Sequence, residues 1–251
     1  TLTFTGAIGG NFALTFVTVG NITQSSTSVR SGTSTITKEG SGILTLTGQN
    51  SFTGAVTVST GTLRLGASGG ATNTPLGTSA GGVTVALGAA LDLNTYSVGG
   101  ASTYETLNLS GTGIGNGGAL IANASGNNNF GAMTLAANAR VINSGSGTIT
   151  FGGTITAANN INFSVGGSGP ININGVYGAT ATSATLTKLE SGTVTIGAAS
   201  ITTGLVRVNA GTLRYGIGNG LSSPPVTIAN GTLDLNGFSD TVGAVTLIGG
   251  S

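Results

Sequence analysis

Apolar and small polar residues alternate along most of this chain, with the period of two residues that characterises a β-strand. Examples are ILTLT at 43–47, VTVS at 56–59 and INFSV at 161–165. In such a segment one face can be buried while Thr, Ser or Asn on the other face stays in contact with water. The runs are short and separated by corners that contain glycine. The sequence therefore predicts an all-β protein with many short strands and no helices.

The chain also resembles itself over a long distance. Several motifs return between 142 and 150 residues later with little change. The matching segments are TLTF at 1–4 with TITF at 148–151, Lys38 with Lys188, TLRLG at 62–66 with TLRYG at 212–216, and LDLN at 91–94 with LDLN at 233–236. This predicts a long internal repeat at 1–147, followed by an incomplete second copy at 148–251.

Within the first copy, strand-like runs begin at Ile43, Val56 and Leu63, and the next group begins at Val83 and Leu91. Such a rhythm of about 20 residues is typical of a solenoid, in which each coil buries the apolar side chains of its neighbours. We therefore predict a right-handed parallel β-helix (β-solenoid) with about 20 residues per coil. It is expected to run through residues 1–251 as one continuous segment of a longer chain. An antiparallel β-sandwich, which also uses short strands and turns, is the alternative.

Three motifs in residues 40–66 are more specific: GILTLTG at 42–48, NSFTG at 50–54 and GTLRLG at 61–66. Together they resemble the autotransporter-associated β-strand repeat of bacterial surface proteins. A second copy at 191–216 keeps both ends of the motif but has AASITTG at 198–204 in place of its central element. The resemblance implies a parallel β-helix in an exported or outer-membrane-anchored protein, with an adhesive or structural function and no catalytic residues.

In a parallel solenoid, inward side chains of similar shape stack on one another from coil to coil. The residues predicted to point inward are Leu63, Leu65, Leu91, Leu93, Leu213, Tyr215, Leu233 and Leu235. The charged residues predicted to point outward are Arg64, Asp92, Arg214 and Asp234. We expect each outward charge either to form an ion pair between coils or to stay solvated, with a contribution of at most about 1 kcal/mol. The alternative is a ligand contact repeated along the rod.

Lys38 with Glu39, and Lys188 with Glu190, are expected to mark a polar corner before each motif.

The few charges exclude several classes of function. The chain has seven Lys and Arg, six Asp and Glu, and no His or Cys, and the acids are dispersed. General acid–base catalysis and metal binding need clustered side chains of these types, so we predict no catalytic residue, no cofactor and no metal site. A polysaccharide-processing β-helix enzyme is a remote alternative. Seven dispersed bases also cannot form the basic stripe that nucleic acids require.

Other properties follow from the same composition. No apolar run approaches the roughly 18 residues of a membrane-spanning helix. With so few titratable groups, stability is expected to change little between pH 4 and pH 9.

Some segments are candidates for binding. The glycine-rich stretches at 67–82 and 111–130 are long enough to form recognition loops. The second contains G-x-G-x-x-G at 113–118, which we interpret as a loop because no helix-like segment follows it. Thr-x-Thr at 45–47 and at 193–195 is typical of flat ice-binding solenoids, but it recurs irregularly.

The sequence thus favours an extracellular structural module, the rod of a bacterial surface fibre, sheath or adhesin stalk. We expect it to be secreted or located at the bacterial outer surface. Its expected partners are further coils or copies of itself, joined end to end or laterally, and surface glycans. The alternative function is that of an adhesin whose loops bind a glycan or a host surface.

Overall fold

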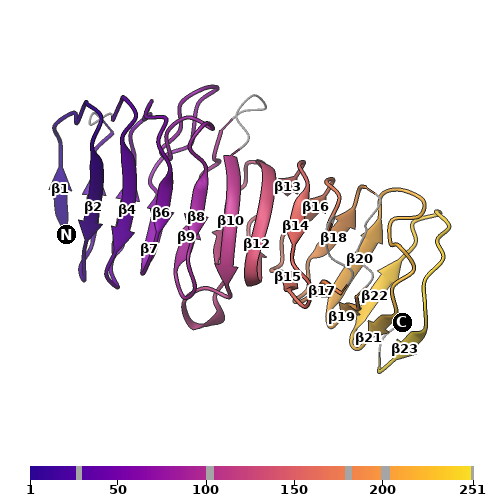
Figure 1. Cartoon of the computed structure of the whole chain (residues 1–251). Helices are drawn as coiled ribbons and strands as arrows, with labels where there is room; N and C mark the ends of the chain where they lie inside the picture. Colours follow the sequence, from indigo (N-terminus) through magenta and orange to yellow (C-terminus); the bar gives the residue numbers. More distant parts are fainter. Residues whose placement is uncertain (27–29, 100–104, 179–182, 199–203, 250–251) are drawn as a thin grey trace.

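The computed structural model describes residues 1–26, 30–99, 105–178, 183–198 and 204–249. Over these ranges the chain forms 23 β-strands and one 3₁₀ turn, η1 (Ile114–Asn116), and no α-helix. The ladders between these strands are parallel, so the antiparallel sandwich is wrong. Figure 1 shows the strands stacked side by side into an elongated rod with the two termini at opposite ends. The predicted parallel β-solenoid is confirmed, with about 10 turns.

The cross-section of the rod has three faces, which are clearest in β12 (Asn128–Asn143). The start of β12 pairs with β13 (Ile149–Phe151), its middle with β14 (Ile155–Ala157) and its end with β15 (Asn162–Gly166). One strand therefore passes along all three faces within a single coil.

Face 1 runs from the first to the last strand of the rod. It contains the end of β12, β15, and the following strands: β1 (Leu2–Phe4), β3 (Ile22–Gln24), β5 (Ile43–Leu46), β7 (Thr62–Leu65), β9 (Ala90–Asp92), β11 (Leu120–Ala122), β17 (Thr185–Lys188), β19 (Val206–Val208), β21 (Val226–Ile228) and β23 (Val245–Leu247).

The other two faces each have regular strands in only one part of the rod. Face 2 contains the middle of β12, β14, and the following strands: β2 (Ala13–Val17), β4 (Thr35–Glu39), β6 (Val56–Val58), β8 (Val83–Val85) and β10 (Glu105–Gly111). Face 3 contains the start of β12, β13, and the following strands: β16 (Ile171–Ile173), β18 (Thr193–Ile196), β20 (Gly211–Tyr215) and β22 (Gly231–Asp234).

Coils differ in length because their corners differ, whereas the strands stay in register. Paired residues are 19 positions apart at Leu44 and Leu63, but 29 positions apart at Leu91 and Leu120. The mean is about 22 residues per coil, close to the predicted 20. Extra residues bulge out at the corners, where they do not disturb the stack.

The two copies of the sequence motif lie on different faces. Lys38 is in β4 on face 2, whereas its counterpart Lys188 is in β17 on face 1. Likewise β7 lies on face 1 and the matching β20 on face 3. A displacement of 150 residues is therefore not a whole number of coils, and the second copy is rotated to the next face of the rod.

The interior is a continuous apolar column. Of the residues predicted to point inward, Leu63, Leu65, Leu91, Leu93, Leu213 and Tyr215 are buried, and Leu233 is partly buried. Farther along, the rings of Phe130 and Phe151 stack with centroids 5.9 Å apart. Each buried side chain of this size contributes roughly 1.5–3 kcal/mol relative to exposure.

Leu235 departs from the prediction, since 46% of its surface is exposed. It follows β22, the last strand of face 3, and no described strand packs on the far side of β22. A position that points inward by register is buried only where a further coil covers it.

Among the described residues, no helix is long and apolar enough to cross a lipid bilayer.

Candidate functional site

The arginine and aspartate residues predicted to point outward form two ion pairs of the same design. Arg64 Nε donates a hydrogen bond to Asp92 Oδ2 at 2.8 Å, and Arg214 Nε donates to Asp234 Oδ2 at 2.7 Å. In both pairs the acid lies one coil beyond the base. The expected ion pairs between coils are therefore present in both copies.

Each aspartate also stabilises the turn that follows it. Asp92 Oδ1 accepts a hydrogen bond at 2.7 Å from the backbone N–H of Asn94, which has a φ of 54°. Asp234 Oδ1 does the same for Asn236 at 2.8 Å, where φ is 50°. Asn tolerates this left-handed conformation better than most residues. The motif L-D-L-N is thus a corner in which one carboxylate joins two coils and fixes a turn.

The two pairs differ in exposure. Asp92 is paired on its far side with Ile121 of β11 and is only 7% exposed, although the alternation predicts an outward side chain. Asp234 has no described strand beyond it and is more exposed. The hydrogen bonds from Arg214 and from the N–H of Asn236 lower the pKa of Asp234. Because the pairs also lie on different faces, they cannot form one row of ligand contacts along the rod.

The lysine that precedes each motif is buried within the core. In register, Lys38 stands between Phe16 and Val58, and Lys188 between Val165 and Val208. The sequence indicates a polar corner at these positions, but not that the lysine is completely enclosed.

Backbone carbonyl groups surround both ammonium groups. Lys38 Nζ donates hydrogen bonds to the carbonyl oxygens of Glu39 at 2.9 Å, Gly40 at 2.7 Å and Thr60 at 3.2 Å. Lys188 Nζ donates to the equivalent carbonyls of Leu189, Glu190 and Ala210. Three acceptors saturate an ammonium group. We call this arrangement the lysine corner.

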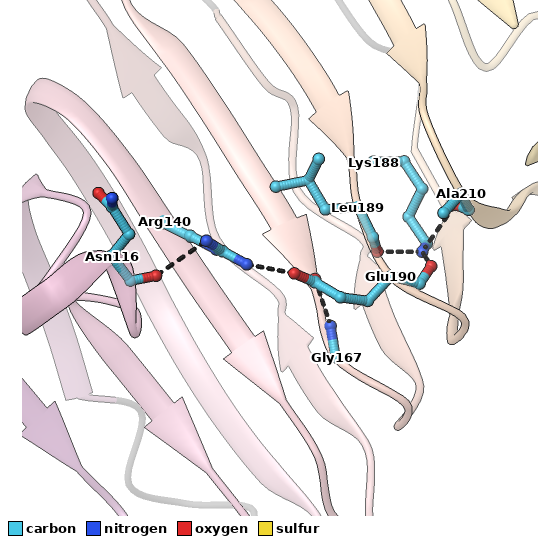
Figure 2. A network of polar contacts seen from close by, with 7 residues as sticks. All are labelled: Asn116, Arg140, Gly167, Lys188, Leu189, Glu190 and Ala210. Atoms are coloured by element: carbon cyan, nitrogen blue, oxygen red, sulfur yellow. Dashed lines mark hydrogen bonds and ion pairs between the residues drawn. The ribbon is translucent and has the colours of Figure 1, made fainter. Parts of the chain in front are cut away.

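The second lysine corner carries an extra contact, shown in Figure 2. Glu190 occupies the position of Gly40 and keeps a left-handed backbone, with φ of 51° against 75° for Gly40. Its carboxylate accepts hydrogen bonds from Arg140 and from the backbone N–H of Gly167, the latter at 2.9 Å. Arg140 also donates to the carbonyl oxygen of Asn116 at 2.8 Å. The strained glutamate thus joins its own coil to an earlier one.

The central motif NSFTG depends on Asn50, which is buried. Its Oδ1 accepts hydrogen bonds from the N–H of Arg30 at 2.9 Å and from Gln24 Nε2 at 2.8 Å. Its Nδ2 donates to the carbonyl oxygen of Pro75 at 2.8 Å. This amide therefore links three successive coils. In the second copy, the corresponding segment at 199–203 lies outside the described residues.

Two groups contradict the expectation that stability is insensitive to pH. Burial raises the pKa of Glu105 to about 7, although a hydrogen bond from Thr74 opposes the shift. Burial lowers the pKa of Lys188 to about 8, although the nearby Glu190 carboxylate opposes the shift. Few charges do not ensure weak pH dependence, because these charges are buried.

Of the two candidate binding loops, the one at 111–130 contributes Ile114 to a shallow groove. It has a volume of about 430 Å³ and is lined by Ser41, Thr60, Gly61, Gly88 and Ile114. The segment at 113–118 folds on itself through a hydrogen bond from the N–H of Gly117 to the carbonyl oxygen of Ile114, at 2.9 Å. It is a closed turn and no helix follows it, in agreement with its interpretation as a loop. The described residues hold no group of three or more metal-ligating side chains.

These observations define a class of protein: a three-faced parallel β-solenoid in which eight of the thirteen charged side chains join or close coils. The family model of the Passenger-associated-transport-repeat matches the chain twice, at residues 36–65 and 186–214. Each match contains one lysine corner and the arginine of one ion pair. The chain therefore contains two segments similar to the autotransporter-associated repeat, set within a parallel β-solenoid. The match implies a secreted or surface-exposed protein. No curated protein and no solved structure gave a significant match.

Proposed function

We propose that this module is structural and acts as the rod of an extracellular fibre, sheath or adhesin stalk. The observation that supports this best is the use of its charged side chains. Lys38, Lys188 and the pairs of Arg64 with Asp92, Arg214 with Asp234 and Arg140 with Glu190 all join or close coils. Charges that hold a stack together are unavailable for catalysis or for ligand binding.

The end coils support assembly into a longer rod. At the N-terminal end Leu2, Phe12 and Val17 are exposed, and at the C-terminal end Val245 and Leu247 are exposed. Their strands offer unpaired backbone groups along one edge, which is a template for pairing with another chain segment. We propose that further coils or further copies of this chain cover these end surfaces.

A non-catalytic function is part of this proposal. Of the six acids, Asp92, Asp234 and Glu190 are ion-paired, and Asp240 accepts a hydrogen bond from the N–H of Leu221 at 2.9 Å. Glu105 is buried and accepts a hydrogen bond from Thr74. Retaining or inverting glycosidases need two carboxyl groups that face one substrate, whereas four of the six acids here are already engaged by other groups of the chain.

An adhesin is the second candidate, and the groove beside Ile114 is the observation that favours it. Protein sites for glycans commonly combine polar side chains with an aromatic platform. This groove is lined by two glycines and Ile114, with Ser41 and Thr60 as its polar side chains and no aromatic residue. The groove therefore supports glycan binding less well than the stacked coils support a rod.

Deleting one coil tests the proposal. Residues 36–55 form one turn of the stack, because Ile36 and Val56 are paired in register. Their deletion should shorten the fibre seen by electron microscopy by about 5 Å per copy and leave the cells' display of it intact. Removing the exposed residues Ala71 and Thr72 from the loop at 67–82 is the matched control and should change neither fibre nor adhesion, because the buried Leu76 and the Pro75 carbonyl stay in place. Loss of adhesion with intact fibres in this control would instead support the adhesin.

A further inference from the structure

The outward side of face 2 carries a file of small polar side chains, six threonines and one asparagine. Strand register places one outward residue of each strand directly above the next, over seven strands. The file consists of Thr15, Thr37, Thr57, Thr84, Asn108, Thr134 and Thr156. The Thr-x-Thr motifs at 45–47 and 193–195 lie on faces 1 and 3, whereas those at 35–37 and 154–156 lie on face 2. The alignment of all seven positions is visible only in the structure.

The residues beside this file are small. Those two positions before it are Ala13, Thr35, Ala55, Gly82, Thr106, Ala132 and Thr154, and those two positions after it are Val17, Glu39, Ser59, Ala86, Ser110, Ala136 and Ala158. One of these residues, Glu39, is charged, and none is aromatic. Face 2 is therefore a nearly flat and nearly uncharged surface.

The other faces differ in this respect. On face 1 the outward file passes from Thr45 to Arg64 and Asp92, and on face 3 it passes from Thr195 to Arg214 and Asp234. Long charged side chains project from those files. Close approach of another flat surface is therefore possible on face 2 and obstructed on the other two.

The chemistry of face 2 restricts its partner. A nucleic acid would require cations and a sugar ring would favour an aromatic platform, and these files provide neither. A second copy of this chain presents the same hydroxyl groups at the same spacing of about 4.8 Å. Two such surfaces match in period, and since they are almost uncharged they do not repel each other. Small side chains on facing sheets can interdigitate, as in dry interfaces between stacked sheets.

The size of the surface predicts the strength of association. Seven strands spaced by about 4.8 Å and five residues wide cover roughly 500 Å² on each copy, or roughly 1,000 Å² in a pair. This is at the lower limit for specific interfaces, which typically bury about 1,200–2,000 Å². A pair held by this surface alone should therefore be weak and reversible, and should gain strength when many coils align.

We propose that face 2 is the surface through which two copies of this rod associate laterally, with threonine file against threonine file. A hollow of about 190 Å³ beside Asn108, lined by Gly82, Thr84, Thr106 and Thr134 among others, interrupts the file. A side chain of the second copy that enters this hollow would set the alignment of the two rods. The inference rests on the proposed structural function and adds the face that bundles the rods.

Charged substitutions at matched positions test it. Thr57 on face 2 and Thr150 on face 3 are both partly buried outward threonines in the middle of a three-residue strand. The full chain, Thr57→Arg and Thr150→Arg would be compared by sedimentation equilibrium up to about millimolar concentration, the affinity range expected for so small an interface. We expect the unmodified chain and Thr150→Arg to associate equally, and Thr57→Arg to associate at least about tenfold more weakly, because its like charges face each other in the pair. Thr84→Glu, which places the opposite charge in the same file, should weaken association similarly.

Three results would overturn the inference. One is an unmodified chain that stays monomeric at these concentrations, and another is an equal loss of association in Thr150→Arg. The third is a monomeric chain that inhibits ice growth unless Thr57 is replaced, which would make ordered water the partner. Circular dichroism and small-angle scattering on the same samples separate these results from a failure of the rod. A folded, elongated monomer contradicts only the lateral pairing, whereas an unfolded chain contradicts the structural function itself.

Discussion

The ammonium group of Lys38 lies 3.2 Å from the carbonyl oxygen of Thr60, which belongs to the next coil. Two further carbonyls at the end of its own strand complete the coordination. The lysine therefore closes one corner and attaches the next coil to it. The same arrangement returns at Lys188, on another face of the rod.

Replacing this lysine measures the contribution of the lysine corner. Lys38→Met keeps most of the buried stem but leaves three carbonyl oxygens without their donor. The free energy of unfolding should fall by about 1–3 kcal/mol, the usual cost of buried unsatisfied polar groups. Urea denaturation followed by circular dichroism provides the measurement, and Lys188→Met should give a similar loss. Unchanged or higher stability in both variants would show that the ammonium groups contribute nothing net.

Glycine at the same corner offers a matched pair of substitutions. Gly61 and Gly88 have φ values of 72° and 76°, so alanine is similarly strained at both. A Cβ at Gly61 would lie 2.6 Å from Lys38 Nζ and from the carbonyl oxygen of Gly42, whereas nothing lies within 4 Å at Gly88. Gly88→Ala should lower the free energy of unfolding by about 1–2 kcal/mol through backbone strain. Gly61→Ala should lower it by about 1–3 kcal/mol more, because the added methyl group overpacks the corner. Equal shifts in melting temperature would contradict the close packing at Gly61.

The buried Glu105 predicts a specific dependence of stability on pH. Its folded-state pKa of about 7 lies above the ordinary value of 4.5, so between these pH values the folded protein binds more protons than the unfolded chain. Stability therefore falls as pH rises through this window, by about 3 kcal/mol for a shift of this size. Glu105→Gln removes the penalty. The free energy of unfolding of the variant should equal that of the unmodified protein near pH 4 and exceed it by about 3 kcal/mol at pH 8. Urea denaturation at both pH values provides the measurement. Parallel pH profiles for the two proteins would contradict the shift.

The two ion pairs provide an internal comparison of burial. Asp92→Ala removes a covered carboxylate that serves Arg64 and the turn at Asn94, and should cost about 1–3 kcal/mol. Asp234→Ala removes the same contacts at an exposed position and should cost less. The loss at Asp234 should also shrink in 1 M salt, because exposed charges are screened. Equal losses in thermal melts, with equal dependence on salt, would show that the covering coil at Asp92 has no effect.

Glu190 combines a strained backbone with a useful side chain, and two substitutions separate the effects. Glu190→Gly loses the contact with Arg140, worth at most about 1 kcal/mol, but relieves left-handed strain of about 1–2 kcal/mol. It should be nearly neutral. Glu190→Ala loses the contact and keeps the strain, so it should be about 1 kcal/mol less stable than the glycine variant. If the alanine and glycine variants have the same midpoint, the left-handed backbone carries no strain.

Parts of the site could be predicted from the sequence. The pairing of Arg64 with Asp92 follows from their outward positions in neighbouring strands, and its recurrence at Arg214 and Asp234 follows from the repeat. The link from Arg140 to Glu190 was missed because 50 residues separate its members and no motif repeats it. The sequence does contain one indication of this link: the second copy has Glu190 at the position where the first copy has Gly40, a position that favours glycine.

Alternation with a period of two determined that this chain is all-β, and recurrence of its motifs determined that like residues stack. The strand period is a local property and the stacking follows from the repeat, so neither depends on the length of the corners. Only the tertiary structure decided which face each strand joins, because this depends on how many residues each corner contains, and no short pattern constrains that number. It therefore decided that the two copies face different directions, that Lys38 is enclosed by carbonyl groups, that Leu235 is left uncovered and that threonines align on face 2.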